Sequence, residues 1–362
     1  MDYRSRWQQK RRERATRQRL VLLVAALAVI GALVLLVRGI ARPAPAGYQL
    51  PGETVSWLTA CDDGVIVTTR TGELLKLTAD LETLSEGWTG PFTHPAGFWG
   101  RAAVLGRHLV VGCEDVRIRA VDVVSGVQSW EFGVRGAVPA VSAEDGSVYF
   151  ASAEPALYRV SADGAMVWRT PLRDEVASSP MVRSEMVVVG TLGGEVCAYE
   201  RSTGEERWCV TPELPAAIYP RPSMGPSSIL VGDDRGRLHS IARSGEMLTS
   251  MQFEGLIRQA VAVGDAIVIA GDSSGLLRRI NPADMTERWQ TRLPGPLAAE
   301  PVIAGGAVWC GAGRSLVEID PEDGSTVSRR DAAAQTSDVI AAHGRIYWAT
   351  TDGHIGAVTI AE

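Results

Sequence analysis

Short apolar runs separated by polar or glycine-containing turns recur along residues 47–362, with a period of about 38–44 residues. Each unit opens on one apolar run, and eight such runs align at 65–69, 108–112, 147–151, 186–190, 228–232, 266–270, 307–311 and 345–349. A second strand, a tight turn such as Ser125-Gly126 or Asp323-Gly324, a third strand and a fourth strand then follow. Glycine accepts a positive φ in such turns. Strand length, alternation and period favour an all-β structure built from propeller blades.

The number of strands of each kind predicts how the ring closes. First, second and fourth strands each number eight when residues 54–60 are included, whereas third strands number seven, because the chain ends after the second strand of its last unit. We expect residues 47–50 to supply the missing outer strand. Pairing the two ends of the domain removes edges that would otherwise stay unpaired. The sequence therefore predicts an eight-bladed β-propeller, with seven blades as the alternative.

Ahead of the repeats lies an uncharged apolar stretch, LVLLVAALAVIGALVLLV, at residues 20–37. Eighteen residues at about 1.5 Å each span roughly 27 Å, close to the hydrocarbon thickness of a bilayer. We predict a basic tail at 1–19, a transmembrane helix at 20–38, a linker at 39–46 and the propeller domain at 47–362. The alternative is a cleaved signal peptide, because Ala44-Pro45-Ala46 has a small-x-small pattern. The length of the apolar run, and Arg38 and Arg42 before that site, favour retention.

Charge is unevenly distributed along the chain. Residues 1–19 carry eight Lys/Arg and two Asp/Glu, a net charge of +6, and the whole chain carries −6, so the remainder carries −12. Positive residues stay on the cytoplasmic side of a membrane. We therefore predict a single-pass protein of the inner (cytoplasmic) membrane, with its N-terminus inside and its propeller on the extracytoplasmic or periplasmic side. An acidic body argues against nucleic-acid binding, which requires a basic surface.

The repeat itself resembles a known family. The sequence GEVCAY at 194–199, followed by TGEERW at 203–208, is the clearest copy of a unit that resembles the quinoprotein-type (PQQ-like) propeller repeat. In size and blade number the chain most resembles BamB-type outer-membrane assembly proteins. That resemblance implies a non-catalytic scaffold that binds an envelope or membrane protein. BamB-type proteins resemble lipoproteins tethered at an N-terminal cysteine, whereas this chain has a predicted membrane span, which favours a different membrane.

Catalysis by a degenerate quinoprotein (PQQ-dependent) dehydrogenase is one alternative function, and ligand sensing is another. Quinoprotein dehydrogenases resemble much longer chains, with an adjacent cysteine pair and a calcium held by Glu, Asn and Asp. This chain has no Cys-Cys dipeptide, and its single asparagine, Asn281, precedes Pro282 in a predicted turn. Its five histidines lie at no metal-ligand spacing. We expect no catalytic site, cofactor or metal.

Two cysteines are placed to meet across a hairpin. Cys197 and Cys209 are equidistant from Thr203, the centre of the turn between two predicted strands. They form either a disulfide, in an oxidising compartment, or a pair of small core residues. The tryptophans that recur at one position of the repeat are expected to pack between neighbouring blades: Trp130, Trp168, Trp208 and Trp289.

Partner binding is expected on loops, because loops form the variable surface of a propeller. The turn after each first strand and the link before each fourth strand share one face. On it we predict partner-binding residues at Leu172, Arg173, Asp174, Glu213, Asp233, Arg235, Phe98 and Trp99. Leu172-Arg173 resembles an apolar-basic pair on BamB-type links, and Phe98 and Trp99 are either exposed anchors or a plug of the ring. The alternative is a set of ordinary solvated loops. Asp233-Asp234 is the best acidic pair for a hard cation, but the adjoining Arg235 and Arg237 favour a surface turn with local charge pairing over a metal site.

Overall fold

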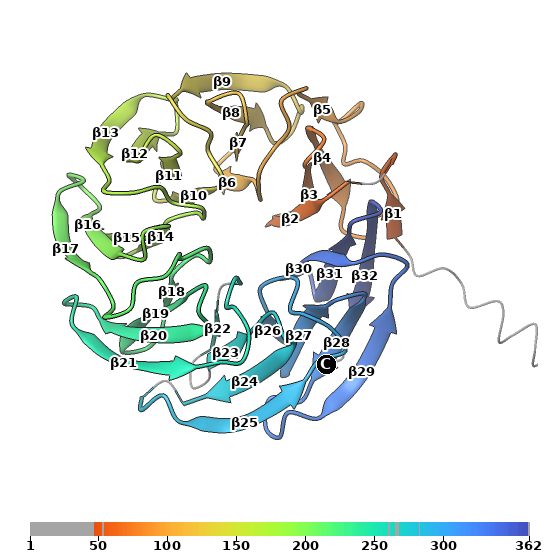
Figure 1. The fold of residues 1–362 in the computed structure, drawn as a ribbon. Coiled ribbons are helices and arrows are strands. Elements are labelled where there is room, and N and C mark those ends of the chain that lie inside the picture. The colour runs from red at the N-terminus through yellow and green to blue at the C-terminus, as the bar shows by residue number, and fades with distance from the viewer. Residues whose placement is uncertain (1–46, 53, 260, 265–267, 282, 361–362) are drawn as a thin grey trace, which may run out of the picture. The chain divides into compact units, whose positions relative to one another are not determined.

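Eight four-stranded antiparallel sheets form a ring in the computed structural model (Figure 1). The structure describes residues 47–360 except 53, 260, 265–267 and 282. Each sheet is a blade that runs from an inner strand near the centre of the ring, such as β2 or β30, to an outer strand, such as β13 or β1 (Figure 1). The predicted all-β propeller and its eight blades are therefore confirmed, and the alternative of seven blades is wrong.

Seven blades consist of four consecutive strands. In chain order they are β2 (Ser56–Cys61), β3 (Gly64–Thr69), β4 (Glu73–Thr78) and β5 (Phe92–Thr93); β6 (Ala103–Leu105), β7 (His108–Gly112), β8 (Arg117–Asp122) and β9 (Gln128–Gly133); β10 (Val141–Glu144), β11 (Ser147–Ser152), β12 (Ala156–Ser161) and β13 (Met166–Pro171); β14 (Met181–Arg183), β15 (Met186–Gly190), β16 (Val196–Glu200) and β17 (Glu206–Val210); β18 (Ser223–Met224), β19 (Ser228–Gly232), β20 (Arg237–Ala242) and β21 (Met247–Gln252); β22 (Ala262–Val263), β23 (Val268–Gly271), β24 (Leu276–Ile280) and β25 (Glu287–Arg292); and β26 (Val302–Ala304), β27 (Ala307–Ala312), β28 (Ser315–Ile319) and β29 (Thr326–Asp331).

The eighth blade joins the two ends of the domain. It contains β30 (Thr336–Ala342), β31 (Arg345–Thr350) and β32 (His354–Thr359), and its outer strand is β1 (Gly47–Gln49). β1 pairs antiparallel with β32, with Tyr48 opposite Ile355. The predicted closure by residues 47–50 is thus confirmed. A second contact ties the last blade to the first, because the Leu58 N–H donates to Asp338 Oδ2 at 2.7 Å.

The core lies between neighbouring blades. β3, β11 and β15 are buried along their whole length, as expected for strands covered on both faces, whereas the outer strand β13 alternates between exposed and covered positions towards its end. Continuous apolar runs therefore mark the middle strands of each blade.

Tryptophans from the outer part of one blade bind the next blade along the chain. Their indole N–H groups donate to backbone carbonyls of the following blade at 2.8–3.0 Å in five places: Trp88 to Val123, Trp130 to Ala162, Trp168 to Arg201, Trp208 to Arg243 and Trp289 to Pro321. Each ring also covers a turn glycine of that blade. At Gly204 φ is +76°, and a Cβ would lie 2.8 Å from the Trp168 ring. The predicted packing of tryptophans between blades is confirmed.

The junction from the blade of β18–β21 to the blade of β22–β25 lacks this contact and shows why tryptophan and glycine belong together. Thr249 of β21 takes the position next to the strand irregularity that Trp208 takes in β17. In the following blade Met285 replaces the turn glycine, with φ 57° and a side chain that is 7% exposed. Where no indole covers the turn, a side chain fits there instead.

The residues ahead of the propeller lie outside the described part of the chain. The predicted tail, transmembrane helix and linker all fall within residues 1–46. Among the residues that the structure describes, no helix has the length and apolar character needed to cross a membrane.

Candidate functional site

Two sets of loops form one face of the propeller, which we call the link face. It comprises the links between blades, such as 172–180 and 211–222, and the turns between the second and third strands of each blade, such as 191–195 and 233–236. These turns are the ones that follow the first strand of each sequence repeat, because a blade begins one strand earlier than the repeat. Backbone hydrogen bonds join the two sets: Leu172 N to Pro155 O at 2.8 Å, Ile218 N to Thr191 O at 3.0 Å and Ile257 N to Asp233 O at 3.1 Å. The grouping of these loops on one face agrees with the sequence analysis.

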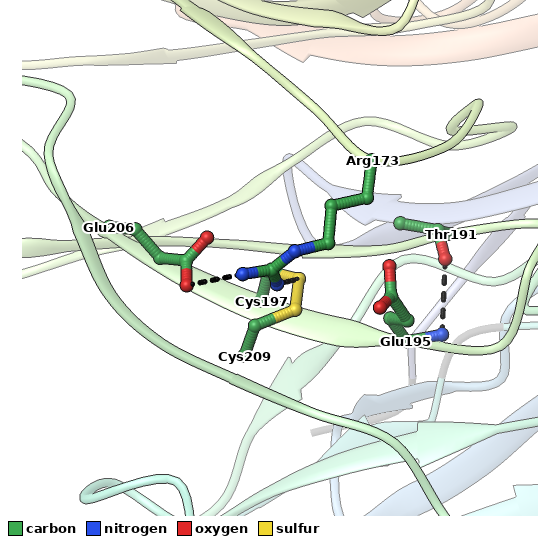
Figure 2. Close-up of a disulfide and its surroundings, with 6 residues drawn as sticks. All are labelled: Arg173, Thr191, Glu195, Cys197, Glu206 and Cys209. Carbon is green, nitrogen blue, oxygen red and sulfur yellow. Dashed lines mark hydrogen bonds and ion pairs between the residues drawn. A yellow bond between two sulfur atoms is a disulfide. The ribbon is translucent and has the colours of Figure 1, made fainter.

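Arg173 of link 172–180 lies beside a disulfide (Figure 2). Leu172 is half-buried against the core, and Arg173 is exposed. The Arg173 guanidinium donates to Glu206 Oε1 at 2.8 Å and lies 3.8 Å from Cys197 Sγ. Asp174 is half-buried and accepts the Glu175 N–H at 2.7 Å. Arg173 and Glu175 are therefore the exposed charged side chains of this link.

Cys197 and Cys209 are joined by a disulfide between directly paired positions of β16 and β17, with Cα atoms 4.0 Å apart. The Glu195 carboxylate lies within 4.8 Å of both sulfurs, the one grouping of three His, Cys, Asp or Glu ligand atoms found among the described residues. Because the sulfurs are bonded to each other, neither is a free thiolate. A single carboxylate does not fit the oxygen-rich calcium site of a quinoprotein.

Asp233 lies inside its blade, so its expected place on the partner surface is corrected. Its side chain is 1% exposed and accepts hydrogen bonds from the backbone N–H groups of Arg235 at 2.8 Å and Arg237 at 2.9 Å. The Arg237 guanidinium and the His239 ring also bind it. Burial raises the pKa of Asp233, but hydrogen bonds from His239 and Arg237 and from the Arg235 N–H outweigh that effect and hold the pKa at about 2. Two predicted residues near Asp233 are exposed: Arg235 on the same turn, and Glu213 on link 211–222.

Phe98 and Trp99 take different places. Phe98 is fully buried in the core beside Cys113, so it is not an exposed anchor. Trp99 is half-buried and lines the centre of the ring, and the Arg70 guanidinium lies 3.9 Å from the centroid of its indole. Phe98 therefore matches neither predicted alternative, since it is part of the core and does not line the centre of the ring, whereas Trp99 lines the central channel.

The centre of the ring holds a channel of about 800 Å³ lined by inner strands and links. Its cations are paired with carboxylates. The Arg101 Nε donates to Asp338 Oδ2 at 2.9 Å and a second bond joins the same two side chains, while Arg221 Nη2 lies 3.3 Å from Glu300 Oε1. Because these charges are balanced, the channel has the character of a polar, near-neutral cavity.

Two exposed apolar side chains lie on link 211–222, and sequence reasoning missed both. Leu214 is 58% exposed and Tyr219 is 39% exposed. Arg237 donates a hydrogen bond to the Leu214 carbonyl, and the Arg258 guanidinium lies 4.9 Å from the Tyr219 ring centroid. The sequence does indicate them, because Leu214 and Tyr219 are apolar residues in a long link that belongs to no predicted strand. Arg237 therefore restrains the backbone of the link at Leu214, and Arg258 packs over the Tyr219 ring.

Comparison with known proteins gives consistent matches. The profile of a family described as "Outer membrane protein assembly factor BamB" matches residues 114–250 and 234–362. The outer membrane protein assembly factor BamB of Yersinia pestis is 25% identical over 212 residues, covering 57% of this chain and 47% of that protein. That of Burkholderia pseudomallei is 24% identical over 122 residues, covering 33% of this chain and 32% of that protein. The chain thus matches less than half the length of either relative.

Solved structures share the fold. BamB from Moraxella catarrhalis matches with a TM-score of 0.73 and 15% identity, covering 86% of this chain and 99% of that chain. The computationally designed Ika8 protein matches with a TM-score of 0.77 and 16% identity, covering 88% and 100%. Sqt1 of Saccharomyces cerevisiae matches with a TM-score of 0.76 and 11% identity, covering 87% and 98%. At these identities the structures agree in fold alone.

Proposed function

This chain belongs to the family of the outer membrane protein assembly factor BamB, and on that premise we propose that it is a non-catalytic scaffold that binds another protein of the cell envelope. In the proposed mechanism, the propeller presents a binding surface to its partner and carries out no chemical step. A rigid ring carries its variable loops on one face, and a partner docks against that face. Family membership supports the class of function, since the matched relatives are named as assembly factors.

The observation that supports the proposal best is a pair of exposed apolar side chains on the link face, Leu214 and Tyr219, on a link that two arginines contact. Interfaces derive most of their affinity from a few buried anchor residues, among which Trp, Tyr and Arg are enriched. Arg237 restrains the backbone of the link at Leu214. Docking on a link whose backbone is already restrained loses less conformational entropy. We therefore place the centre of the interface on link 211–222.

The predicted residues around this centre complete the proposed interface. Arg173 and Glu213 are exposed on neighbouring links, and Arg235 is exposed on the turn beside them. Leu172 and Asp174 are half-buried and flank Arg173. Charged groups at the rim of an interface set orientation and on-rate more than affinity.

We propose further that residues 20–37 hold the propeller at the inner membrane, with the N-terminus in the cytoplasm. The support is the apolar length of that segment and the basic residues before it. Protease treatment of spheroplasts tests this topology. Digestion of the propeller, with a protected N-terminal tag, agrees with it; release of an intact propeller into the soluble periplasm indicates cleavage instead.

Affinity purification from detergent-solubilised membranes tests the scaffold. Arg173→Glu and Leu214→Ala should each reduce recovery of the partner, with the larger loss for Leu214→Ala. The matched control is Arg243→Glu, because Arg243 is an exposed arginine on the opposite face, where its guanidinium donates to Pro226 O at 3.2 Å. Unchanged recovery with both link-face variants, or equal loss with the control, counts against the proposal.

Ligand binding in the channel is a second candidate function, favoured by the cavity of about 800 Å³. Its lining combines Trp99 and Tyr219 with paired charges, which suits an uncharged polar molecule with an apolar face. Tryptophan fluorescence with a set of such small molecules tests it: a saturable change that Trp99→Phe removes supports binding there, and no change across the set argues against it.

A further inference from the structure

A serine, a histidine and an aspartate form a hydrogen-bonded chain in the blade of β18–β21. His239 of β20 lies directly opposite Ser250 of β21. The Ser250 Oγ lies 2.8 Å from His239 Nδ1, and His239 Nε2 lies 3.0 Å from Asp233 Oδ2. Asp233 and His239 are 1% and 2% exposed, whereas Ser250 is exposed to solvent. The buried His239 and Asp233 thus form a hydrogen-bonded chain that ends at the exposed Ser250 hydroxyl.

The surroundings of Asp233 determine which ring nitrogen carries the proton. Four groups donate to its carboxylate, and they hold the carboxylate in its ionised form, with a pKa of about 2. An ionised carboxylate only accepts hydrogen bonds. The Nε2 of neutral His239 must therefore carry the hydrogen, and Nδ1 is left with a lone pair directed at Ser250 Oγ. Ser250 donates its hydroxyl proton to Nδ1.

We propose that Ser250 is a reactive serine that small activated esters acylate, with His239 as its general base and Asp233 as a positioning residue. A nucleophile, a base in hydrogen-bond contact and a group that orients the base are the arrangement that activates a serine hydroxyl. This assignment is independent of partner binding and goes beyond the proposed scaffold function. The three residues lie at positions 233, 239 and 250, on a turn and two strands, so no local sequence motif indicates them.

The step balances without any further reactant. Ser250 Oγ attacks the ester carbonyl carbon, and its proton passes to His239 Nδ1. As the tetrahedral intermediate collapses, the carbon–oxygen bond to the alcohol portion breaks, and the protonated His239 returns the proton to the departing alkoxide. The products are an acylated serine and a free alcohol. Because Ser250 is open to solvent, we expect it to react with activated esters that carry a good leaving group.

Ser328 offers a control within the same molecule. It lies on the outer strand β29 and its hydroxyl donates to the cross-strand carboxylate of Glu318, which is a much weaker base than imidazole. Both serines therefore have a cross-strand partner on the adjacent strand. They differ in the basicity of that partner and in exposure, since Ser328 is half-buried and Ser250 is exposed.

The test treats the full chain in detergent with p-nitrophenyl acetate and locates acetyl groups by peptide mass spectrometry. General-base assistance contributes about 10²–10⁴-fold, so Ser250 should be acetylated at least about 100-fold faster than Ser328. Ser250→Ala should remove that adduct. His239→Gln should slow acetylation of Ser250 at least about 100-fold, because an amide can donate to Asp233 but is not a base. Circular dichroism establishes that this variant is folded.

Equal acetylation of Ser250 and Ser328 in the wild-type protein overturns the proposal, and this comparison does not depend on any variant folding. Fast acetylation of Ser250 that persists in folded His239→Gln overturns it as well, because exposure alone would then explain the reactivity. Loss of partner recovery with no effect on acetylation, or the reverse, separates this site from the proposed scaffold function.

Discussion

A Cβ placed on Gly204 tests the contact between tryptophan and glycine that joins neighbouring blades. In Gly204→Ala the new methyl group would lie 2.7 Å from Thr170 Oγ1 and 2.8 Å from the Trp168 indole. The residue also has φ +76°, a backbone conformation that L-residues rarely adopt. The substitution therefore combines backbone strain with a steric clash at the core of the junction.

The two costs can be separated by size. Holding a non-glycine residue in the left-handed region costs about 1–2 kcal/mol, and overpacking a tight site costs about 1–3 kcal/mol. Gly204→Ala should lower the free energy of unfolding by about 2–5 kcal/mol. Gly306→Ala is the matched control, because its φ is +71° and no heavy atom lies within 4 Å of its new Cβ. That variant carries only the backbone cost.

Urea unfolding of the detergent-solubilised chain, followed by far-ultraviolet circular dichroism, measures both variants. Trp168→Ala should itself cost about 3–5 kcal/mol. The double variant with Gly204→Ala should be less destabilised than the sum of the single variants, by about 1–3 kcal/mol, because the clash is then absent. Equal destabilisation by Gly204→Ala and Gly306→Ala, with additive effects in the double variant, would refute the reasoning.

Three further predictions concern buried bonds. Reduction of the Cys197–Cys209 disulfide, with a sequence separation of 12, should lower the free energy of unfolding by about 3 kcal/mol, and an unchanged urea midpoint under reductant would contradict this. Asp233→Asn should cost about 2 kcal/mol at neutral pH, because the folded pKa of Asp233 is lowered from 3.8 to about 2. A lowered pKa stabilises the folded state above the unfolded value and loses this effect as the pH falls, so the difference from wild type in acid-unfolding titrations should shrink between about pH 4 and pH 2; a constant difference would refute it. Asp338→Ala should cost about 1–3 kcal/mol, because it removes the acceptor of the buried Leu58 N–H and leaves Arg101 with Glu300 at 3.8 Å as its carboxylate partner, and hydrogen exchange should increase first in β2 and β30.

The repeat pattern made the architecture predictable, because each blade repeats one arrangement of apolar strands and glycine turns. The closure of the ring also followed from the pattern, since a unit that lacks an outer strand has one free segment to supply it. β1 pairs with β32 where the strand count placed it. Trp168 could be assigned to a junction between blades because its position recurs, and a recurring aromatic residue reflects a recurring contact.

Side-chain direction within loops was not predictable from the same pattern. Asp233 and Asp234 are adjacent acidic residues in one turn, yet Asp233 folds back onto backbone N–H groups, and Asp234 pairs with Arg258 at 2.8 Å. The hydrogen bonds available to each side chain, rather than residue type, separate them. Contacts between distant residues were equally hidden: Arg101 and Asp338 are 237 positions apart and meet only because the ring closes.

Partner binding at the link face is tested most directly by photo-crosslinking in intact cells. A photoreactive benzoylphenylalanine replaces Leu214 on the link face or Arg243 on the opposite face, in otherwise identical full-length chains. We predict a discrete crosslinked envelope protein from position 214 and none from position 243. Absence of any adduct at position 214, or the same adduct from both positions, would contradict a scaffold that binds its partner through this face.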